Sequence, residues 1–104
     1  MKTIFTPEIA VDVQVLDNYT GEIIFTSEYT LGDIVNILPG QPCNAQYILE
    51  CCVKQFNKDL EEFVREEDQK SVLLARACMK LLAEGIYTCT YDPKEGWIQI
   101  SLTL

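Results

Sequence analysis

The residues that could carry catalysis or bind metal ions form no catalytic, metal-binding or cofactor-binding motif in this chain. It contains no histidine, which removes the commonest general base, the usual partner of nucleophilic Ser and Cys residues, and the commonest metal ligand. The five glycines are scattered at predicted turns and helix ends, so no glycine-rich loop follows a strand to cradle a phosphate. We therefore expect a protein that is not an enzyme and that uses no cofactor.

The cysteines are the most reactive side chains that remain. Cys51 and Cys52 are adjacent and lack the Cys-x-x-Cys spacing with which two thiolates bind one zinc ion, and neighbouring residues of a helix point in different directions. The number of cysteines is odd, and several fall at core-like positions. We expect reduced thiols that pack as small hydrophobes, no metal site, and a cytoplasmic location. The full set is Cys43, Cys51, Cys52, Cys78 and Cys89.

Negative charge is the strongest feature of the composition. The 104 residues include 16 Asp and Glu against 8 Lys and Arg, for a net charge of −8. No Lys or Arg occurs between Thr3 and Val53. A surface of this kind repels nucleic acid and anionic membranes and favours a basic partner. The acidic residues that we expect on the N-terminal half of this surface are Glu8, Asp12, Asp17, Glu22 and Glu28.

A second acidic run covers residues 59–68, DLEEFVREED. Calcium binding requires an oxygen-rich loop with a glycine turn, whereas Phe63 and Val64 follow helical spacing here. Paired catalytic carboxylates require a pocket, which a solvated helix face does not provide. The run therefore indicates either a solvated helix end or an extension of the partner-binding surface. In the second case the contributing residues are Glu61, Glu62, Glu66 and Glu67.

Aromatic residues near the C-terminus suggest a further contact point. Trp97 falls on the expected outer face of the last strand, and Tyr87 and Tyr91 share one face of the strand before it. An exposed tryptophan beside a tyrosine is the kind of anchor that dominates protein interfaces. These rings either anchor a partner or cover the open side of a small sheet.

Hydrophobic periodicity predicts two β-hairpins. In residues 8–16, Ile9, Val11, Val13 and Val15 alternate with polar residues, as in a half-buried strand. A turn at residues 17–21 leads to a second strand over residues 22–29. At the other end of the chain, strands over residues 86–91 and 97–104 flank a turn at residues 92–96.

Helical patterns fill the middle of the chain. A capping-box-like segment from Thr30 to Asp33 begins a short helix that we expect to stop at residues 39–40. An amphipathic helix covers residues 45–65, with Asn44 as its N-cap. Residues 71–85 form a helix that is apolar on most of its circumference, and Gly85 suits its C-terminal end. Such a helix needs cover on several sides, so we expect it to be the buried core helix. Residues 66–70 contain no Gly or Pro, so the sequence leaves open one long bent helix, but we favour a break there because Asp68 or Ser71 can cap the second helix.

The predicted order is thus β-β-α-α-α-β-β in a single domain covering residues 1–104. It is an α+β fold, with a four-stranded antiparallel sheet packed on a helical layer. Whether both hairpins join one sheet, or lie on opposite sides of the helices, is left open by the sequence pattern.

No family is identified from particular residues. In overall character, a small, acidic, histidine-free α+β protein is similar to phage-encoded inhibitors and bacterial immunity proteins. Some of these inhibitors occupy nucleic-acid sites on restriction or CRISPR machinery by presenting carboxylates in place of phosphates. That similarity implies a nucleic-acid mimic that antagonises a basic partner and does not itself bind nucleic acid or membranes.

The leading hypothesis is therefore a non-enzymatic binding protein whose partner is a basic protein or a nucleoprotein complex. Two alternatives come from other classes. One is a homodimeric adaptor or secretion-chaperone-like module that associates through edge strands or exposed aromatic residues. The other is a small-ligand-binding domain.

Overall fold

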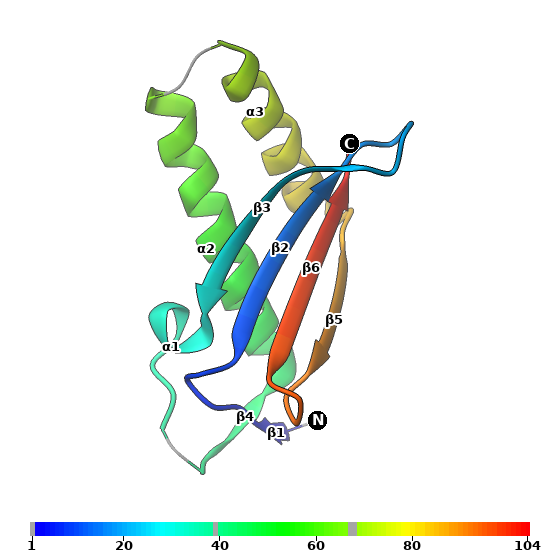
Figure 1. Ribbon diagram of the computed structural model, residues 1–104. Helices are drawn as coiled ribbons and strands as arrows, with labels where there is room; N and C mark the ends of the chain where they lie inside the picture. The colour runs from blue at the N-terminus through cyan, green and yellow to red at the C-terminus, as the bar shows by residue number, and fades with distance from the viewer. Residues whose placement is uncertain (1, 39, 67–68) are drawn as a thin grey trace.

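The computed structural model describes residues 2–38, 40–66 and 69–104, with only the backbone described for Lys2 and Glu66 (Figure 1). It is an α+β fold with two sheets and a helical layer on one side of the larger sheet. The strands are β1 (Lys2–Ile4), β2 (Ala10–Leu16), β3 (Ile23–Thr30), β4 (Pro42–Asn44), β5 (Thr88–Asp92) and β6 (Trp97–Thr103). The helices are α1 (Leu31–Ile34), α2 (Ala45–Glu66) and α3 (Gln69–Glu84).

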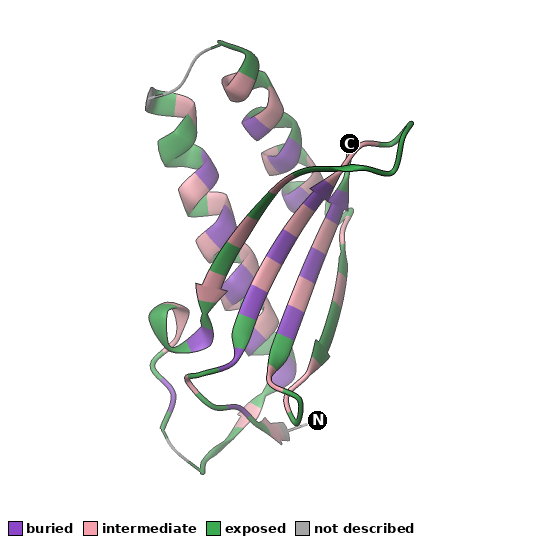
Figure 2. Cartoon of the chain, viewed as in Figure 1, coloured by how far each residue is buried: buried purple, intermediate pink, exposed green. Residues whose placement is uncertain are grey.

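The larger sheet has the strand order β3-β2-β6-β5, so both predicted hairpins belong to one sheet. Its central strands are the two with the clearest alternation. On β2 the buried residues are Val11, Val13 and Val15, and on β6 they are Ile98, Ile100 and Leu102. Figure 2 shows this alternation as purple bands along both strands. Strands with the most apolar inner faces take the centre because only there are they covered along their full length.

The sheet is mixed, and the prediction of an antiparallel sheet is wrong on this point. The two hairpins are antiparallel, but β2 and β6 run parallel where the hairpins meet. Helix α2 begins at the sheet end where β2 starts and runs past the opposite end, and the shorter α3 returns only part of the way (Figure 1). The chain therefore starts β5 at the end where β2 finishes, and β6 then repeats the direction of β2.

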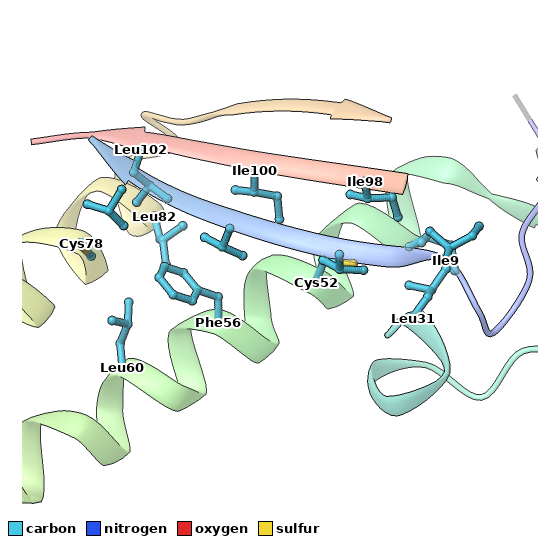
Figure 3. Packing of buried hydrophobic residues seen from close by; sticks show 14 of the residues in the cluster. Ile9, Leu31, Cys52, Phe56, Leu60, Cys78, Leu82, Ile98, Ile100 and Leu102 are labelled. Atoms are coloured by element: carbon cyan, nitrogen blue, oxygen red, sulfur yellow. The ribbon is translucent and has the colours of Figure 1, made fainter. Parts of the chain in front are cut away.

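Helix α2 is the helix that lies along the sheet. Asn44 caps it through its side-chain Oδ1, which accepts hydrogen bonds from the backbone N–H groups of Gln46 at 2.9 Å and Tyr47 at 3.4 Å. This confirms the predicted N-cap. Figure 3 shows Cys52 and Phe56 pointing from α2 toward the sheet. Ala45 is buried at the start of α2, and four further buried residues recur every four positions: Ile48, Cys52, Phe56 and Leu60.

Helix α3 is not confirmed as the buried core helix. It packs antiparallel to α2 (Figure 1), and its buried residues are Ala75, Cys78 and Leu82. The side chain of Leu73 is 59% exposed. The upper parts of both helices extend beyond the sheet (Figure 1), so no other described element covers one side of α3 there. The predicted break before α3 coincides with residues 67–68, which lie outside the described residues.

Both hairpin turns are built in the same way. The Oδ1 of Asp17 accepts hydrogen bonds from the N–H groups of Tyr19 and Thr20 at 2.7 and 3.0 Å. The Oδ1 of Asp92 likewise accepts hydrogen bonds from the N–H groups of Lys94 and Glu95, both at 3.1 Å. Each turn ends in a glycine with positive φ, Gly21 or Gly96, as turn chemistry predicts.

Two local features differ from the sequence-based expectation. Thr30 is at the N-cap position of the short helix α1, but its side chain makes no hydrogen bond to the backbone of the helix; its Oγ1 donates instead to the Asp33 carboxylate at 2.6 Å. The helix ends at Ile34, well before residues 39–40. The small sheet formed by β1 and β4 was not predicted. Three-residue strands are too short to show a period.

Candidate functional site

The larger sheet has one covered face and one open face. Helices α2 and α3 lie against the face that carries the buried valines and isoleucines (Figures 1 and 3). The opposite face has no element over it in the described part of the chain (Figure 1). The side chains on this face are those of alternate residues, because successive residues of a strand point to opposite sides.

Two carboxylates lie next to each other on the open face. Asp12 on β2 is the register partner of Glu28 on β3. The N–H of Leu31 donates to the carbonyl of Ile9 at 2.8 Å, so the pair formed by Asp12 and Glu28 is of the non-hydrogen-bonded type, in which facing side chains are closest. Like charges in directly opposite positions destabilise a sheet.

No basic residue offsets this pair within the sheet. The four strands of the larger sheet contain Asp12, Glu28 and Asp92 but no Lys or Arg. The row that includes the pair continues through Gln99 on β6 to Thr90 on β5, both uncharged. The centre of the open face is therefore negative, and the other two side chains of this row, those of Gln99 and Thr90, are neutral hydrogen-bonding groups.

Trp97 belongs to the same face. It is the first residue of β6, is 39% exposed, and has Ala10 of β2 and Asp92 of β5 as its register neighbours. Alternation along β6 confirms the expected outward direction of Trp97, Gln99, Ser101 and Thr103. The structure thus brings together three of the predicted site residues, Asp12, Glu28 and Trp97. We call this surface the acidic sheet face.

The other predicted acidic residues lie elsewhere. Glu8 precedes β2 and Glu22 precedes β3, so these two exposed residues lie near opposite ends of the hairpin. Asp17 holds the turn, and hydrogen bonds from the backbone N–H groups of Thr20 and Tyr19 lower the pKa of its carboxyl. Glu61 and Glu62 are exposed on α2, which covers the opposite face of the sheet. The side chain of Glu66, and the whole of Glu67, lie outside the described residues.

A groove of about 410 Å³ opens between the edge strand β3 and the two helices. Its lining is mainly apolar and comes from residues 24–27 of β3, from α2 and from α3. Among the described residues that line it, Asp59 of α2 is the one that is charged.

Asp59 ties β3 to α2. Its Oδ2 accepts a hydrogen bond from the Tyr29 hydroxyl at 2.5 Å, and its Oδ1 accepts one from Gln55 Nε2 at 3.1 Å. Burial, followed by the hydrogen bond to this carboxylate, raises the pKa of Tyr29. The phenol therefore stays protonated and keeps donating over the whole physiological pH range. A carboxylate with two donors at its oxygens is held in one orientation, facing the groove.

Four of the five cysteines, all except Cys51, lie in or against the core. None of the five forms a disulfide, and Cys52 and Cys78 are buried as expected. Burial raises the pKa of Cys52 to about 12 and that of Cys78 to about 11. Both thiols are therefore protonated and weakly nucleophilic at neutral pH.

The described residues contain neither a cluster of potential metal ligands nor a helix suited to cross a membrane. Across residues 2–38, 40–66 and 69–104, no three or more Cys, Asp or Glu side chains gather where a metal ion could be held. Within the same ranges, no helix has the length and apolar character needed to cross a membrane.

No protein-family model matches the chain, and comparisons with curated proteins and with solved structures return no significant match. We therefore infer the function from the surfaces of the molecule.

Sequence reasoning missed the groove and the contact between Tyr29 and Asp59. The sequence pattern groups Asp59 with the solvated acidic run of α2, although its position one turn after the buried Phe56 and beside Leu60 indicates partial burial. The groove lies between the edge strand and the two helices. Short-range sequence patterns do not predict how these elements are placed relative to one another.

Proposed function

We propose that the protein is a non-enzymatic binding protein that antagonises a basic, nucleic-acid-handling partner through the acidic sheet face. The proposal rests on one observation: Asp12 and Glu28 are direct register partners on an uncovered sheet face whose strands contain no Lys or Arg. Such a pair lowers stability by a few tenths to about 1 kcal/mol. A basic group from a partner would turn this unfavourable contact into a favourable one.

The remaining features of the face suit a protein partner. Gln99 and Thr90 extend the carboxylate row with groups that donate and accept hydrogen bonds. Trp97 at one end provides a partly exposed aromatic ring of the kind enriched at binding hot spots. Carboxylates that act on a basic surface raise the association rate and compete with phosphates for the same groups. Occupation of a nucleic-acid site, in the manner of phage-encoded inhibitors of restriction or CRISPR machinery, is the antagonism we infer.

The test begins with the isolation of a partner. Immobilised wild-type protein and the Asp12→Asn/Glu28→Gln variant are exposed in parallel to host lysate, and the retained proteins are identified by mass spectrometry. We expect a basic nucleic-acid-binding protein that the wild type retains and the variant does not. Addition of the purified wild-type protein should then release that partner from its DNA or RNA.

The matched control is Glu61→Gln/Glu62→Gln, which removes the same number of charges from α2 on the other side of the sheet. It should retain the partner as the wild type does. Equal retention by the wild type and the Asp12→Asn/Glu28→Gln variant would contradict the proposal. So would a retained partner whose nucleic-acid binding is unaffected by the protein.

A further inference from the structure

The two edges of the larger sheet are protected to different extents. Strand β5 has five residues and is followed directly by Pro93, which limits further pairing. Strand β3 has eight residues and contains neither Pro nor Lys. Its only pairing partner within the described sheets is β2, so alternate residues present unpaired backbone N–H and C=O groups to the open side. Edge strands this long are usually blunted, because they attract another strand.

The groove lies along this open edge. Four consecutive β3 residues, 24–27, form one wall. Ile24 is 39% exposed there, and Phe63 of α2, on the facing wall, is 43% exposed. A strand added beside β3 would lie about 4.8 Å from it and would point alternate side chains toward the helical layer. Those side chains would enter the groove and cover its apolar lining.

The charges select the occupant. Asp59 is the one charged residue among the described residues of the lining, which include no Lys or Arg. Glu28 lies farther along the same strand. A second copy of β3 is a poor occupant, because it would bring its own Glu28 and no compensating base. We propose that β3 accepts an extended peptide segment of a partner, whose inward side chains are apolar except for one Arg or Lys that pairs with Asp59.

Asp59 is well placed for this role. Its two oxygens already accept hydrogen bonds from Tyr29 and Gln55, and a carboxylate has acceptor capacity for more. A charged donor from a peptide would meet a carboxylate that is already oriented. Recognition would then combine main-chain pairing along β3 with one apolar and one charged side-chain contact, which is the usual division in β-strand addition. The lining of the groove does not include Asp12, Glu28 or Trp97, so peptide binding can be tested separately from the acidic sheet face.

The probe is a synthetic peptide that alternates Val and Thr and carries one central Arg, with binding measured by calorimetry. A second peptide carries citrulline, the neutral isostere, in place of Arg. The wild-type protein should bind the Arg peptide about tenfold more tightly, as expected for a hydrogen bond between charged groups. Asp59→Asn should remove this preference. In Glu62→Gln, the matched neutralisation of an exposed acidic residue on the same helix, the preference should persist.

Two further comparisons test the groove and the edge. Phe63→Ala should weaken peptide binding about tenfold, whereas Leu73→Ala, which removes a more exposed side chain outside the groove, should leave it unchanged. An Arg peptide N-methylated on its edge-facing amides should not bind. The inference is overturned if the wild type binds neither peptide, if N-methylation has no effect, or if Leu73→Ala weakens binding as much as Phe63→Ala does. Circular dichroism of each variant establishes that it is folded.

Discussion

Asp12 and Glu28 give the clearest prediction at the scale of single residues. Because like charges in facing positions destabilise a sheet, removal of one charge should stabilise the fold. We expect Glu28→Gln to raise Tm by about 1–5 °C, measured by thermal denaturation at low salt. Glu22→Gln, at an exposed position beside the turn, is the control and should change Tm less. A lower Tm for Glu28→Gln would show that the carboxylate makes a stabilising contact within the sheet.

Gly32 occupies a position where the chain passes close to itself. Its N–H donates to the carbonyl of Pro7 at 2.9 Å, and a Cβ at this position would lie 2.8 Å from the Pro7 Cβ. Gly32→Ala should therefore lower the free energy of unfolding by about 1–3 kcal/mol.

The test is whether Gly32→Ala lowers or raises the free energy of unfolding. Without the clash, replacing a helical glycine by alanine would stabilise the fold by up to about 1 kcal/mol. Urea denaturation of the wild type and Gly32→Ala measures the difference. A variant more stable than the wild type would mean that α1 moves away from Pro7 at little cost.

The buried thiols predict a loss of stability at alkaline pH. Burial raises the pKa of Cys52 to about 12 and that of Cys78 to about 11, from an ordinary value of 9.0. The unfolded chain therefore releases these protons at lower pH than the folded protein. Their contribution to stability is complete below pH 9 and is lost as the pH rises through the folded-state values.

We expect Tm to fall between pH 9 and 11, and to fall less steeply in a Cys52→Ala/Cys78→Ala variant. Tyr29, whose pKa is also raised, is present in both proteins, so the difference in slope isolates the thiols. Parallel Tm profiles for the two proteins would contradict the assignment.

At the scale of elements, α2 provides the central helical contact with the sheet. Phe56 is 1% exposed, and its side chain points from α2 toward the sheet (Figure 3). Phe56→Ala should cost about 3–5 kcal/mol of the free energy of unfolding. Leu73→Ala on α3 should change it by less than about 0.5 kcal/mol. Chemical denaturation of both variants checks the ranking, and a larger loss for Leu73→Ala would restore α3 as the core helix.

Strands and helix ends were predictable because short-range patterns determine them. The alternation of Val11, Val13 and Val15 gives the inner face of β2, and the caps at Asn44 and Gly85 act within one turn of helix. In the structure, Gly85 has a φ of 74°, and the N–H of Ile86 donates to the Leu81 carbonyl at 2.8 Å. None of these features depends on distant parts of the chain.

The direction of β6 and the burial of α3 were not predictable in the same way. The alternation of buried and exposed residues in a strand does not indicate the direction in which the strand runs. The direction of β6 depends on where α3 ends, because β5 starts there and β6 is antiparallel to β5. Residues 71–85 are apolar on most sides of the helix, so burial of all these sides would be favourable. The sheet of this chain, however, is shorter than the helices and ends before they do (Figure 1). Leu73 is exposed for that reason.

The candidate site was predictable in part. Asp12, Glu28 and Trp97 were selected from the sequence, and they share one face because their strands pair in a register that keeps all three outward. The same reasoning grouped Glu61 and Glu62 with them, although a helix on the covered side cannot share that surface. The role of Asp17 in its turn became clear only from the hydrogen bonds to its Oδ1.

At the scale of the whole molecule, the charge is divided between the two layers. The strands of the larger sheet contain no Lys or Arg, whereas α2 and α3 carry bases that alternate with acids: Lys54, Lys58, Arg65, Lys70, Arg76 and Lys80. The negative electrostatic potential that results from the net charge of −8 is therefore strongest on the sheet side. A basic partner approaching the molecule would be oriented toward the acidic sheet face by this field, and the effect would weaken as salt screens it.

The most direct test of this account is the affinity of the isolated partner for the wild type and for Asp12→Asn/Glu28→Gln, measured over a range of salt concentrations. We predict that at an ionic strength of about 0.1 M the variant binds at least about tenfold more weakly, and that its affinity depends less steeply on salt. Equal affinity and equal salt dependence for the two proteins, together with weaker binding by Glu61→Gln/Glu62→Gln, would contradict the account and place the interface on the helices.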